Sequence, residues 1–333
     1  MKKSLAAIVI LVLSAGAIFA LFEVAVTRPG AGAGDVMFEA RKGESTRSVA
    51  RNLERQGVVP SALLFELEMR GCNRGQSVKA GEYLIPLDYS TRQVAELLLS
   101  ARTWARPVTI REGLTVRETA LEMEKAGIMS ASDFNEAARG MAERMRADGF
   151  PGGTLEGYLF PDTYNFSKSI TPMAAVVVMV DTFRKKAAET LPMEVVEDPV
   201  ALHRLVTMAS IIEKETGAGF ERPLISAVFH NRLKRGMLLQ SDPTVIYSLP
   251  SFDGNIRKKD LSYDSPYNTY RYRGLPPGPI ANPGLESLAA AWRPADSDYI
   301  YFVSKNNGEH YFSETLAEHN RAVITFQIRR GRK

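Results

Sequence analysis

The run from residue 209 to residue 284 decides the fold and the function of this chain. It begins ASIIEKET (209–216) and continues with the polar segments FHNRL (229–233), LQSDPT (239–244) and YNTY (267–270), then the turn-rich GLPPGPIANPG (274–284). A packed core does not require so many amides, tyrosines and turn residues around one acidic helix end. A site that grips a large polar substrate does, so the sequence predicts such a site here.

Residues 200–216 have the spacing of a mostly buried helix. One face would carry Leu205, Ala209, Ile212 and Thr216. Glu213 lies beside this stripe, whereas Lys214 and Glu215 point about 100° and 200° away around the helix. A carboxyl against apolar neighbours is disfavoured as an anion, so we expect Glu213 to hold a proton near neutral pH, as a glycosidic general acid must. A surface ion pair is the alternative for Glu213, and we expect Glu215 to be dispensable.

The composition narrows the class of protein. A chain of 333 residues has room for about two domains. Its net charge is +4, and the only dense basic run is the tail at 329–333, which favours a solvated tail over a nucleic-acid partner. The single Cys72 excludes an intrachain disulfide and a cysteine-based metal site. Four scattered histidines without a zinc-binding spacing disfavour zinc, so we expect no metal and no cofactor.

An uncharged stretch from Ser4 to Phe22 follows two lysines at the N-terminus. About 20 such residues suffice to cross a bilayer as a helix. Lysines before it and Glu23 after it predict a cytoplasmic N-terminus (residues 1–3), a transmembrane helix at 4–24 and an exported remainder. A cleaved signal peptide is the alternative, because Ala15-Gly16-Ala17 resembles a cleavage site. The apolar run continues beyond that point, which favours an uncleaved single-pass anchor.

A linker-like segment at 25–35 precedes an internal repeat. ARKGESTR (40–47) aligns with IREGLTVR (110–117), and each copy predicts a short strand, a glycine turn and a Ser/Thr-capped helix that ends at glycine. The core-facing positions would be Val49, Ala50 and Leu53 in one copy and Thr119, Ala120 and Met123 in the other. The unit resembles a LysM-like module, a fold used to hold N-acetylated glycans. A purely structural spacer is the alternative.

The remaining pattern predicts an α+β protein. Residues 81–86 read as a strand and residues 90–99 as a capped helix. A second linker-like patch at 149–153 would separate a LysM-like α/β repeat region (36–150) from a mixed α+β catalytic domain (151–333). A short strand is expected at 299–303.

Polar and aromatic side chains near the acidic helix end are candidates for substrate contact. Donors and acceptors suited to amides and hydroxyls come from Asn231, Gln240, Asp242 and Asn268. Flat faces suited to sugar rings come from Tyr158, Tyr267, Tyr270 and Tyr272. Each has an ordinary alternative, because tyrosines are often half-buried core residues and Asp242-Pro243 can simply begin a turn.

Four runs together resemble the signatures of the YceG-like endolytic murein transglycosylases. They are LEGYLFPDTY (155–164), ASIIEKET (209–216), VFHNRLKRGMLLQSDPTVIY (228–247) and YNTYRYRGLPPGPIANPG (267–284). Their order and spacing match, and the resemblance covers about residues 36–325. It implies a single-pass inner-membrane enzyme with a periplasmic C-terminal domain. Such an enzyme cuts nascent peptidoglycan strands between N-acetylmuramic acid and N-acetylglucosamine, leaves 1,6-anhydro-N-acetylmuramic ends and limits strand elongation.

The resemblance also implies roles for single residues and partners. The family's catalytic glutamate falls on Glu213, and the substrate-binding candidates are Glu156, Gln240, Asp242, Asn268 and Tyr270. The implied partners are glycan strands, the cytoplasmic membrane and the peptidoglycan synthases of elongation or division. Two other classes stay open: a hydrolase in which Glu156 or Asp242 serves as a second carboxylate, and a non-catalytic peptidoglycan-binding scaffold.

Overall fold

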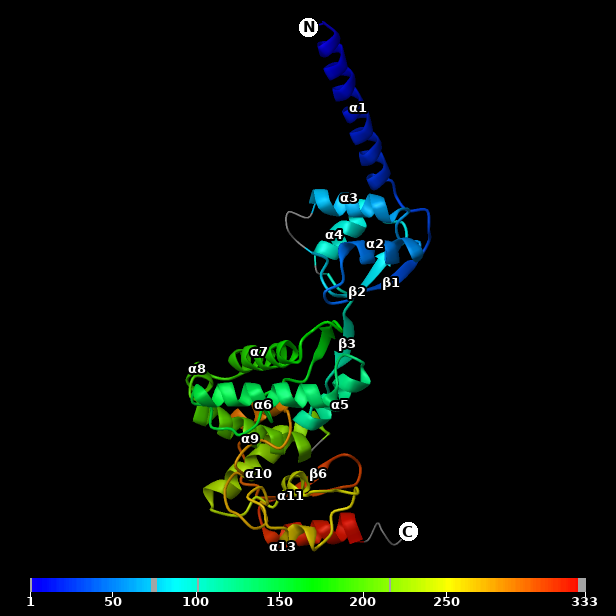
Figure 1. The fold of residues 1–333 in the computed structure, drawn as a ribbon. Coiled ribbons are helices and arrows are strands. Elements are labelled where there is room, and N and C mark those ends of the chain that lie inside the picture. The colour runs from blue at the N-terminus through cyan, green and yellow to red at the C-terminus, as the bar shows by residue number, and fades with distance from the viewer. Residues whose placement is uncertain (1, 73–76, 101, 216, 329–333) are drawn as a thin grey trace. The chain divides into compact units, whose positions relative to one another are not determined.

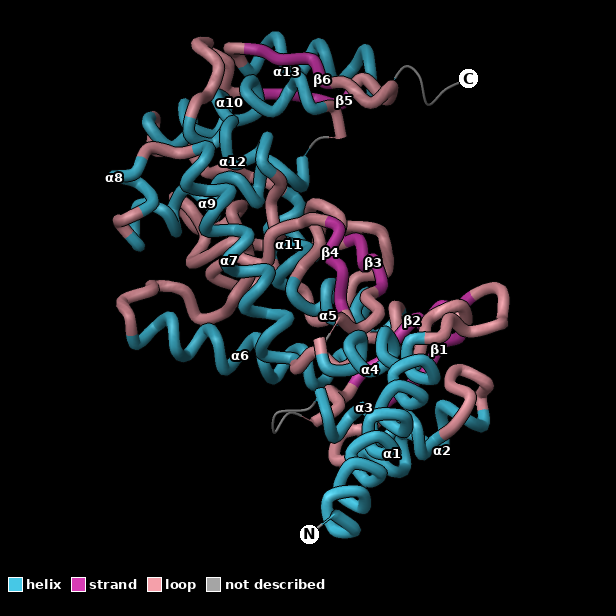
Figure 2. The backbone as a smooth tube through the Cα atoms, turned by 90° about the horizontal axis from the view of Figure 1, so that it is seen from above, coloured by secondary structure: helices cyan, strands magenta, loops and turns pink. Residues whose placement is uncertain are grey.

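The computed structural model describes residues 2–72, 77–100, 102–215 and 217–328. Thr216 and the basic tail lie outside the described residues, as do the side chains of residues 2–6 and of Cys72. The chain forms two compact units, one made of the residues up to Arg106 with Asn165–Ile170, the other of Pro107–Tyr164 with the residues from Thr171 onward. Helices dominate both units, and the described residues form three two-stranded sheets (Figures 1 and 2). The predicted α+β class is confirmed.

Unit 1 packs three helices against one antiparallel sheet. Its elements are α1 (Lys2–Thr27), β1 (Asp35–Ala40), α2 (Thr46–Arg55), α3 (Ala62–Cys72), β2 (Gly81–Pro86) and α4 (Thr91–Leu99). β1 pairs with β2 in the register Asp35↔Pro86 to Ala40↔Gly81. Because side chains alternate along a strand, Phe38 of β1 and Tyr83 of β2 enter the core beneath the helices. The strand expected at 81–86 and the capped helix expected at 90–99 are both confirmed.

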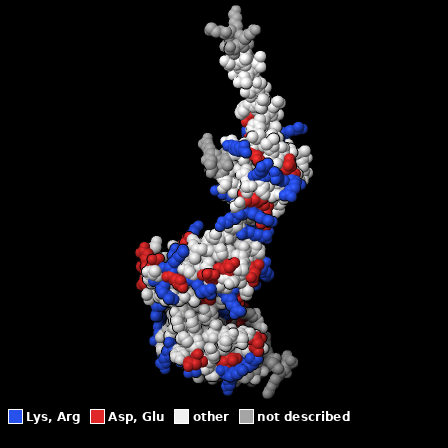
Figure 3. Space-filling model, viewed as in Figure 1, with Lys and Arg blue, Asp and Glu red and all other residues white. Residues whose placement is uncertain are grey.

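The N-terminal helix α1 is apolar over most of its length and joins unit 1 at its end. Residues Ala7–Thr27 have a mean hydropathy of 2.5 and enough length to cross a membrane. Figure 3 shows no charged side chain along most of this stretch, until its C-terminal end. Near its C-terminal end, Glu23 forms an ion pair with Arg92, which also binds the buried carboxylate of Glu68. Val26 is fully buried, so the last turn of α1 is part of the unit 1 fold.

Both copies of the repeat fold as a strand, two helices and a strand. The second copy consists of β3 (Arg106–Thr109), α5 (Val116–Lys125), α6 (Ala131–Ala147) and β4 (Thr163–Phe166). Ser45 caps α2 and Thr115 caps α5, each accepting a hydrogen bond from the backbone N–H three residues on. The buried positions of the two helices are the predicted ones, Val49, Ala50 and Leu53 in α2 and Thr119, Ala120 and Met123 in α5. The internal repeat is therefore a repeat of structure as well as of sequence.

Two segments with linker composition are packed parts of the fold. The N–H of Gly30 donates to Asp88, and the carbonyl of Gly34 accepts from Leu87, so the segment after α1 lies against unit 1. In the patch at 149–153, Phe150 is buried edge-to-face against Tyr158 in the core of unit 2. Glycine composition suggested flexible spacers, but backbone hydrogen bonds and one aromatic side chain hold both segments in place. The boundary between the units falls near residue 106 and does not coincide with the expected position near 150.

Unit 2 is a helical body with a small C-terminal sheet. Beyond the second repeat copy it contains α7 (Pro172–Thr190), α8 (Met193–Val196), α9 (Pro199–Glu215), α10 (Arg222–Lys234), α11 (Asp242–Ser248), α12 (Leu285–Trp292), β5 (Tyr301–Ser304), β6 (His310–Ser313) and α13 (Leu316–Val323). Short 3-10 turns cover Gly219–Glu221 and Asp260–Ser262, and a π-helical turn covers Ile324–Ile328. β5 and β6 pair antiparallel, and β5 overlaps the strand expected at 299–303.

Helix α9 is the central element of unit 2. Its residues from Leu205 to Ile212 are all buried, and the helix packs against α8, α10, α11 and α12. Because a helix apolar on all sides must lie inside a core, the hydrophobic pattern of 200–216 is explained. The acidic residues 213–215 follow directly after the buried part of α9 and form its C-terminal end.

Candidate functional site at the end of α9

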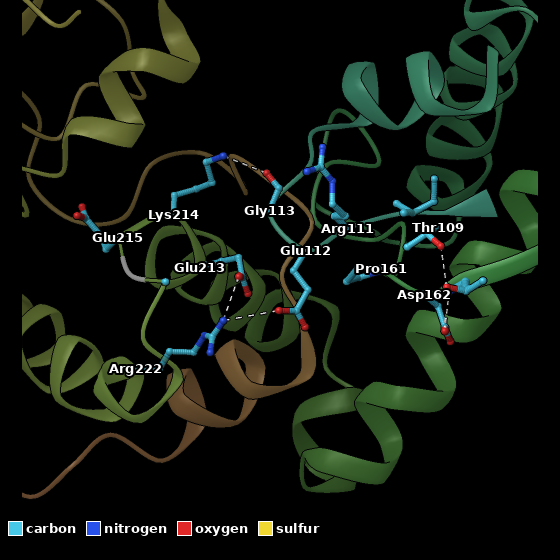
Figure 4. Close-up of a pocket in the computed structure, with 13 residues that line it drawn as sticks. Thr109, Arg111, Glu112, Gly113, Pro161, Asp162, Glu213, Lys214, Glu215 and Arg222 are labelled. Atoms are coloured by element: carbon cyan, nitrogen blue, oxygen red, sulfur yellow. Dashed lines mark hydrogen bonds and ion pairs between the residues drawn. The ribbon is translucent and has the colours of Figure 1, made fainter. Parts of the chain in front are cut away.

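A polar cavity of about 680 Å³ opens at the C-terminal end of α9. Its walls come from three separate parts of unit 2, namely residues 109–113, residues 161–163, and residues 213–215 with 217 and 222. Figure 4 shows Glu213 and Arg222 facing Glu112 across it, with Glu215 directed to the other side. The carboxyl-rich helix end predicted from the sequence therefore does border a solvent-accessible cavity.

Glu213 is held by three donors. Its Oε2 accepts hydrogen bonds from the N–H of Gly284 at 3.0 Å and from Oγ of Ser287 at 2.7 Å. Its Oε1 lies 3.3 Å from Nη2 of Arg222. The side chain is 6% exposed. The carboxyl of Glu213 was expected to lie against apolar neighbours. It instead forms a buried ion pair with Arg222, and both of its oxygens accept hydrogen bonds.

Arg222 organises this side of the cavity. Its guanidinium also binds Glu286 at 2.6 Å and Oγ of Ser287 at 3.0 Å, and it approaches Glu112 at 3.6 Å. Burial raises the pKa of Glu112, and the nearby Glu213 carboxylate raises it further, against the effect of Arg222. Arg222 begins α10 after a short 3-10 turn, and no sequence pattern used above marked it.

The carboxyl of Glu215 contacts the signature run 228–247. Ser241 donates a hydrogen bond of 2.5 Å to its carboxyl, which is half-buried and also borders the cavity. Burial raises the pKa of Glu215 to about 7; the Ser241 bond opposes the rise, Asp242 adds to it and Arg232 opposes it. Glu215 therefore points away from Glu213, as helix spacing predicts, and it still borders the cavity. The helix turns its carboxyl from Glu213 toward the loop before α11, where the polar run 239–244 is located.

Asp242 and Tyr270 form a pair beside Glu215. The hydroxyl of Tyr270 donates to Oδ1 of Asp242 at 2.5 Å, and burial raises the pKa of this tyrosine. Gln240 is exposed and has a positive φ of 52°, a conformation that costs energy for a residue other than glycine. Its N–H donates to Thr269, so the loops that carry 240–242 and 268–270 are joined. Asp242 and Tyr270 therefore lie near Glu215, whereas Gln240, Asp242 and Tyr270 are not among the residues that line the cavity.

Asn268 and several other candidates have structural roles. Asn268 is fully buried, and its amide donates to the carbonyls of Leu261 and Tyr263 while its Oδ1 accepts from Tyr270. Asn231 donates to two backbone carbonyls of the segment before β5. Tyr158 is buried and hydrogen-bonds His203, Tyr267 packs on Tyr247, and the exposed Tyr272 binds Asp264. None of these five borders the cavity.

Glu156 is buried outside this cavity. It is 5% exposed, accepts a hydrogen bond from the N–H of Val116 at 3.0 Å and another from the hydroxyl of Tyr247 at 3.4 Å. Burial raises its pKa to about 8, against the two hydrogen bonds. Its turn is fixed by Gly157, whose φ of +88° and close packing on Pro279 leave no space for a side chain.

The second repeat copy forms part of the cavity wall. Lys214 donates from Nζ to the carbonyl of Gly113 at 3.1 Å. The buried Asn282 joins this loop to the signature runs, because its amide donates to Leu114 while its Oδ1 accepts from the N–H groups of Gly157 and Leu159. Residues 109–113 of the second repeat copy therefore line the cavity.

Comparison with known proteins identifies the class. The model of the YceG-like family matches residues 38–325, so the chain belongs to the YceG-like family. It is 35% identical over 295 residues to the endolytic murein transglycosylase of Bacillus subtilis, covering 84% of this chain and 81% of that protein. It is 28% identical over 317 residues to the endolytic murein transglycosylase of Streptococcus pneumoniae strain D39, covering 85% of this chain and 56% of the longer relative.

A solved structure has the same fold. The crystal structure of a YceG-like protein from Listeria monocytogenes superposes with a TM-score of 0.60 at 32% sequence identity. The match covers 87% of this chain and all of the Listeria chain. The family resemblance predicted from the four signature runs is thereby confirmed.

Proposed function

We propose that this protein is an endolytic peptidoglycan lytic transglycosylase, a lyase that cuts glycan strands between N-acetylmuramic acid and N-acetylglucosamine. Its membership of the YceG-like family and its 35% identity to an endolytic murein transglycosylase support the activity. The observation that carries the proposal at the level of chemistry is the cavity at the end of α9, where two carboxyls of one helix end meet the family's signature runs.

Lytic transglycosylation needs one group that first gives a proton and then takes one. The acid protonates the glycosidic oxygen as the bond between that oxygen and C1 of the muramic residue breaks. The substrate's own N-acetyl group stabilises the positive charge that develops at C1. The ionised group then accepts the proton of the muramic 6-hydroxyl while O6 bonds to C1. The anhydro ring closes without water.

Two carboxyls compete for this role, and the geometry favours Glu215 over the Glu213 expected from the sequence. Glu215 has a pKa of about 7, which suits both giving and taking a proton near neutral pH. Asp242 and Tyr270, which lie near it, can position hydroxyl and amide groups of a sugar. Glu213 has both oxygens occupied by fixed donors, so its function is to hold Arg222 and the loop at Gly284.

The membrane and partner assignments extend the same proposal. The apolar α1 would anchor the protein in the cytoplasmic membrane in a single pass, with its catalytic domain in the periplasm. There the enzyme would act on nascent strands beside the peptidoglycan synthases and limit their elongation. The strand–helix–helix–strand layout of the unit 1 repeat supports a LysM-like glycan contact.

Product analysis tests the proposal. Purified glycan strands are incubated with the full-length protein, and the fragments are analysed by mass spectrometry. Internal cuts with 1,6-anhydro-N-acetylmuramic ends are expected. Reducing ends would instead assign a hydrolase, with Asp242 as the second carboxylate beside Glu215. No cleavage by folded protein would favour a binding scaffold.

A further inference from the structure

A second cavity, of about 450 Å³, lies where α5 begins alongside α6. Its polar lining comes from Arg117 on α5, from Ser132, Asn135 and Arg139 on α6, and from Thr154 and Glu156 on the following loop. None of these residues borders the cavity at the end of α9. The catalytic chemistry proposed above makes no use of it.

The charges of this cavity favour an anion. Arg117 and Arg139 are exposed, and neither forms a hydrogen bond or ion pair with another described residue. The carboxyl of Glu156 does not neutralise them at pH 7, because burial raises its pKa to about 8 and it keeps its proton. Two arginine side chains with free donors match the geometry of carboxylate groups.

The two cavities share one stretch of chain. Gly113 borders the catalytic cavity, and Val116 borders the second cavity and donates its N–H to Glu156. They are three positions apart in the chain, which limits the distance between their Cα atoms to about 11 Å. Arg117 follows Val116, so its Cα lies within about 15 Å of the Cα of Gly113 in the wall of the catalytic cavity.

We propose that the cavity between Arg117 and Arg139 binds the free carboxylates of the peptide stem carried by a muramic residue next to the cut bond. This inference rests on the proposed function, because only a peptidoglycan strand presents such a stem beside the catalytic cavity. An extended pentapeptide spans up to about 17 Å, enough to bridge the two cavities. The site would select strands that still carry their peptides over strands without them.

Binding of a free stem peptide tests the site without any cleavage. The probe is L-alanyl-γ-D-glutamyl-L-lysyl-D-alanyl-D-alanine, which carries two free carboxylates, titrated by calorimetry into the full-length protein in detergent. The double variant Arg117→Gln/Arg139→Gln should weaken binding at least about tenfold, and added salt should weaken wild-type binding. The matched control, Lys125→Gln/Arg144→Gln, removes the same charge from the same two helices outside the cavity and should bind as wild type.

Cleavage rates give the second measurement. Wild type should cut peptide-bearing strands with a higher kcat/KM than strands stripped of peptide, and the double variant should lose this preference while keeping its rate on stripped strands. Absence of peptide binding to wild type, or equal binding by the double variant, would overturn the subsite. If wild type binds the peptide and the double variant does not, while wild type cleaves neither strand, the subsite is supported and the proposed activity is overturned.

Discussion

The hydroxyl of Ser241 donates a hydrogen bond to the carboxyl of Glu215, and this contact joins the end of α9 to the start of α11. It places the second glutamate of EKE, and not the first, among the polar residues of the signature run 239–244. The first glutamate, Glu213, turns to Arg222 instead. Two residues apart on one helix, the two carboxyls thus belong to different clusters, and this division sets the first prediction.

Substitution of each glutamate by glutamine separates their roles. Glu215→Gln keeps the shape but removes the proton, so we expect turnover to fall by at least ~100-fold. Glu213→Gln keeps the acceptor for Gly284 and weakens only the contact with Arg222, so a smaller loss of activity with a measurable drop in melting temperature is expected. Anhydro-product release on purified strands measures both, with the exposed Glu194→Gln as control. A larger catalytic loss in Glu213→Gln than in Glu215→Gln would return the acid role to Glu213.

The pH dependence of kcat/KM should report the Glu215 carboxyl. Because the acid form must donate the first proton, activity should fall above about pH 7 as this group, with its pKa of about 7, ionises. The Ser241 hydrogen bond stabilises the ionised form, so Ser241→Ala should raise the pKa and move the basic limb to higher pH. Rate profiles of wild type and Ser241→Ala between pH 5 and pH 9 measure this. A limb that does not move would exclude Glu215 as its source.

Glu156→Gln should stabilise the protein at alkaline pH. The pKa of Glu156 is raised from an unfolded value near 4.5 to about 8 in the folded state, so the native state binds more protons and stability falls as pH rises through this window. Below pH 4 the variant and wild type should differ little. Above pH 8 the variant should be more stable by on the order of a few kcal/mol. Thermal unfolding at pH 4 and pH 9 tests this, and an equal difference at both pH values would contradict it.

Truncation should reveal where the catalytic unit begins. A chain that starts near residue 107 retains the loop at Gly113, which Lys214 and Asn282 hold in place, and it should fold and cut soluble glycan. A chain that starts near residue 150 loses that cavity wall and should lose activity or fail to fold. Circular dichroism and product assays on both chains decide the question. Full activity in the shorter chain would show that the second repeat copy is dispensable.

The N-terminal helix should stay attached in the mature protein. Intact protein is expected in the inner-membrane fraction, and protease added to spheroplasts should digest the ectodomain. N-terminal sequencing provides the direct check, because a mature chain that begins after Ala17 or Ala20 would establish cleavage. Both possible cleavage points precede Glu23, so the Glu23–Arg92 ion pair should form whether or not the helix is cleaved. The substitution Arg92→Met removes this ion pair and tests separately whether it fixes α1 to unit 1.

Local patterns in the sequence were sufficient to predict the helices whose caps and buried faces depend on neighbouring residues. Ser45 and Thr115 each stand before a helix, and the buried faces of α2 and α5 follow from helix spacing alone. The motif order likewise identified the family. Glycine content misled at residues 149–153, because the burial of Phe150 depends on Tyr158 and not on the local composition.

The direction of each polar side chain at the site was decided only by the tertiary structure. Helix spacing correctly separated Glu213 from Glu215 but could not tell which one meets Ser241 and which one meets Arg222, since both partners lie on other elements. Asn282 and Gly113 are far apart in sequence, yet their contact brings the second repeat copy into the cavity wall. The sequence by itself determined the helices, the repeat and the residues available for catalysis. Long-range packing determined which carboxyl is buried beside which partner, and this sets which of them can carry a proton.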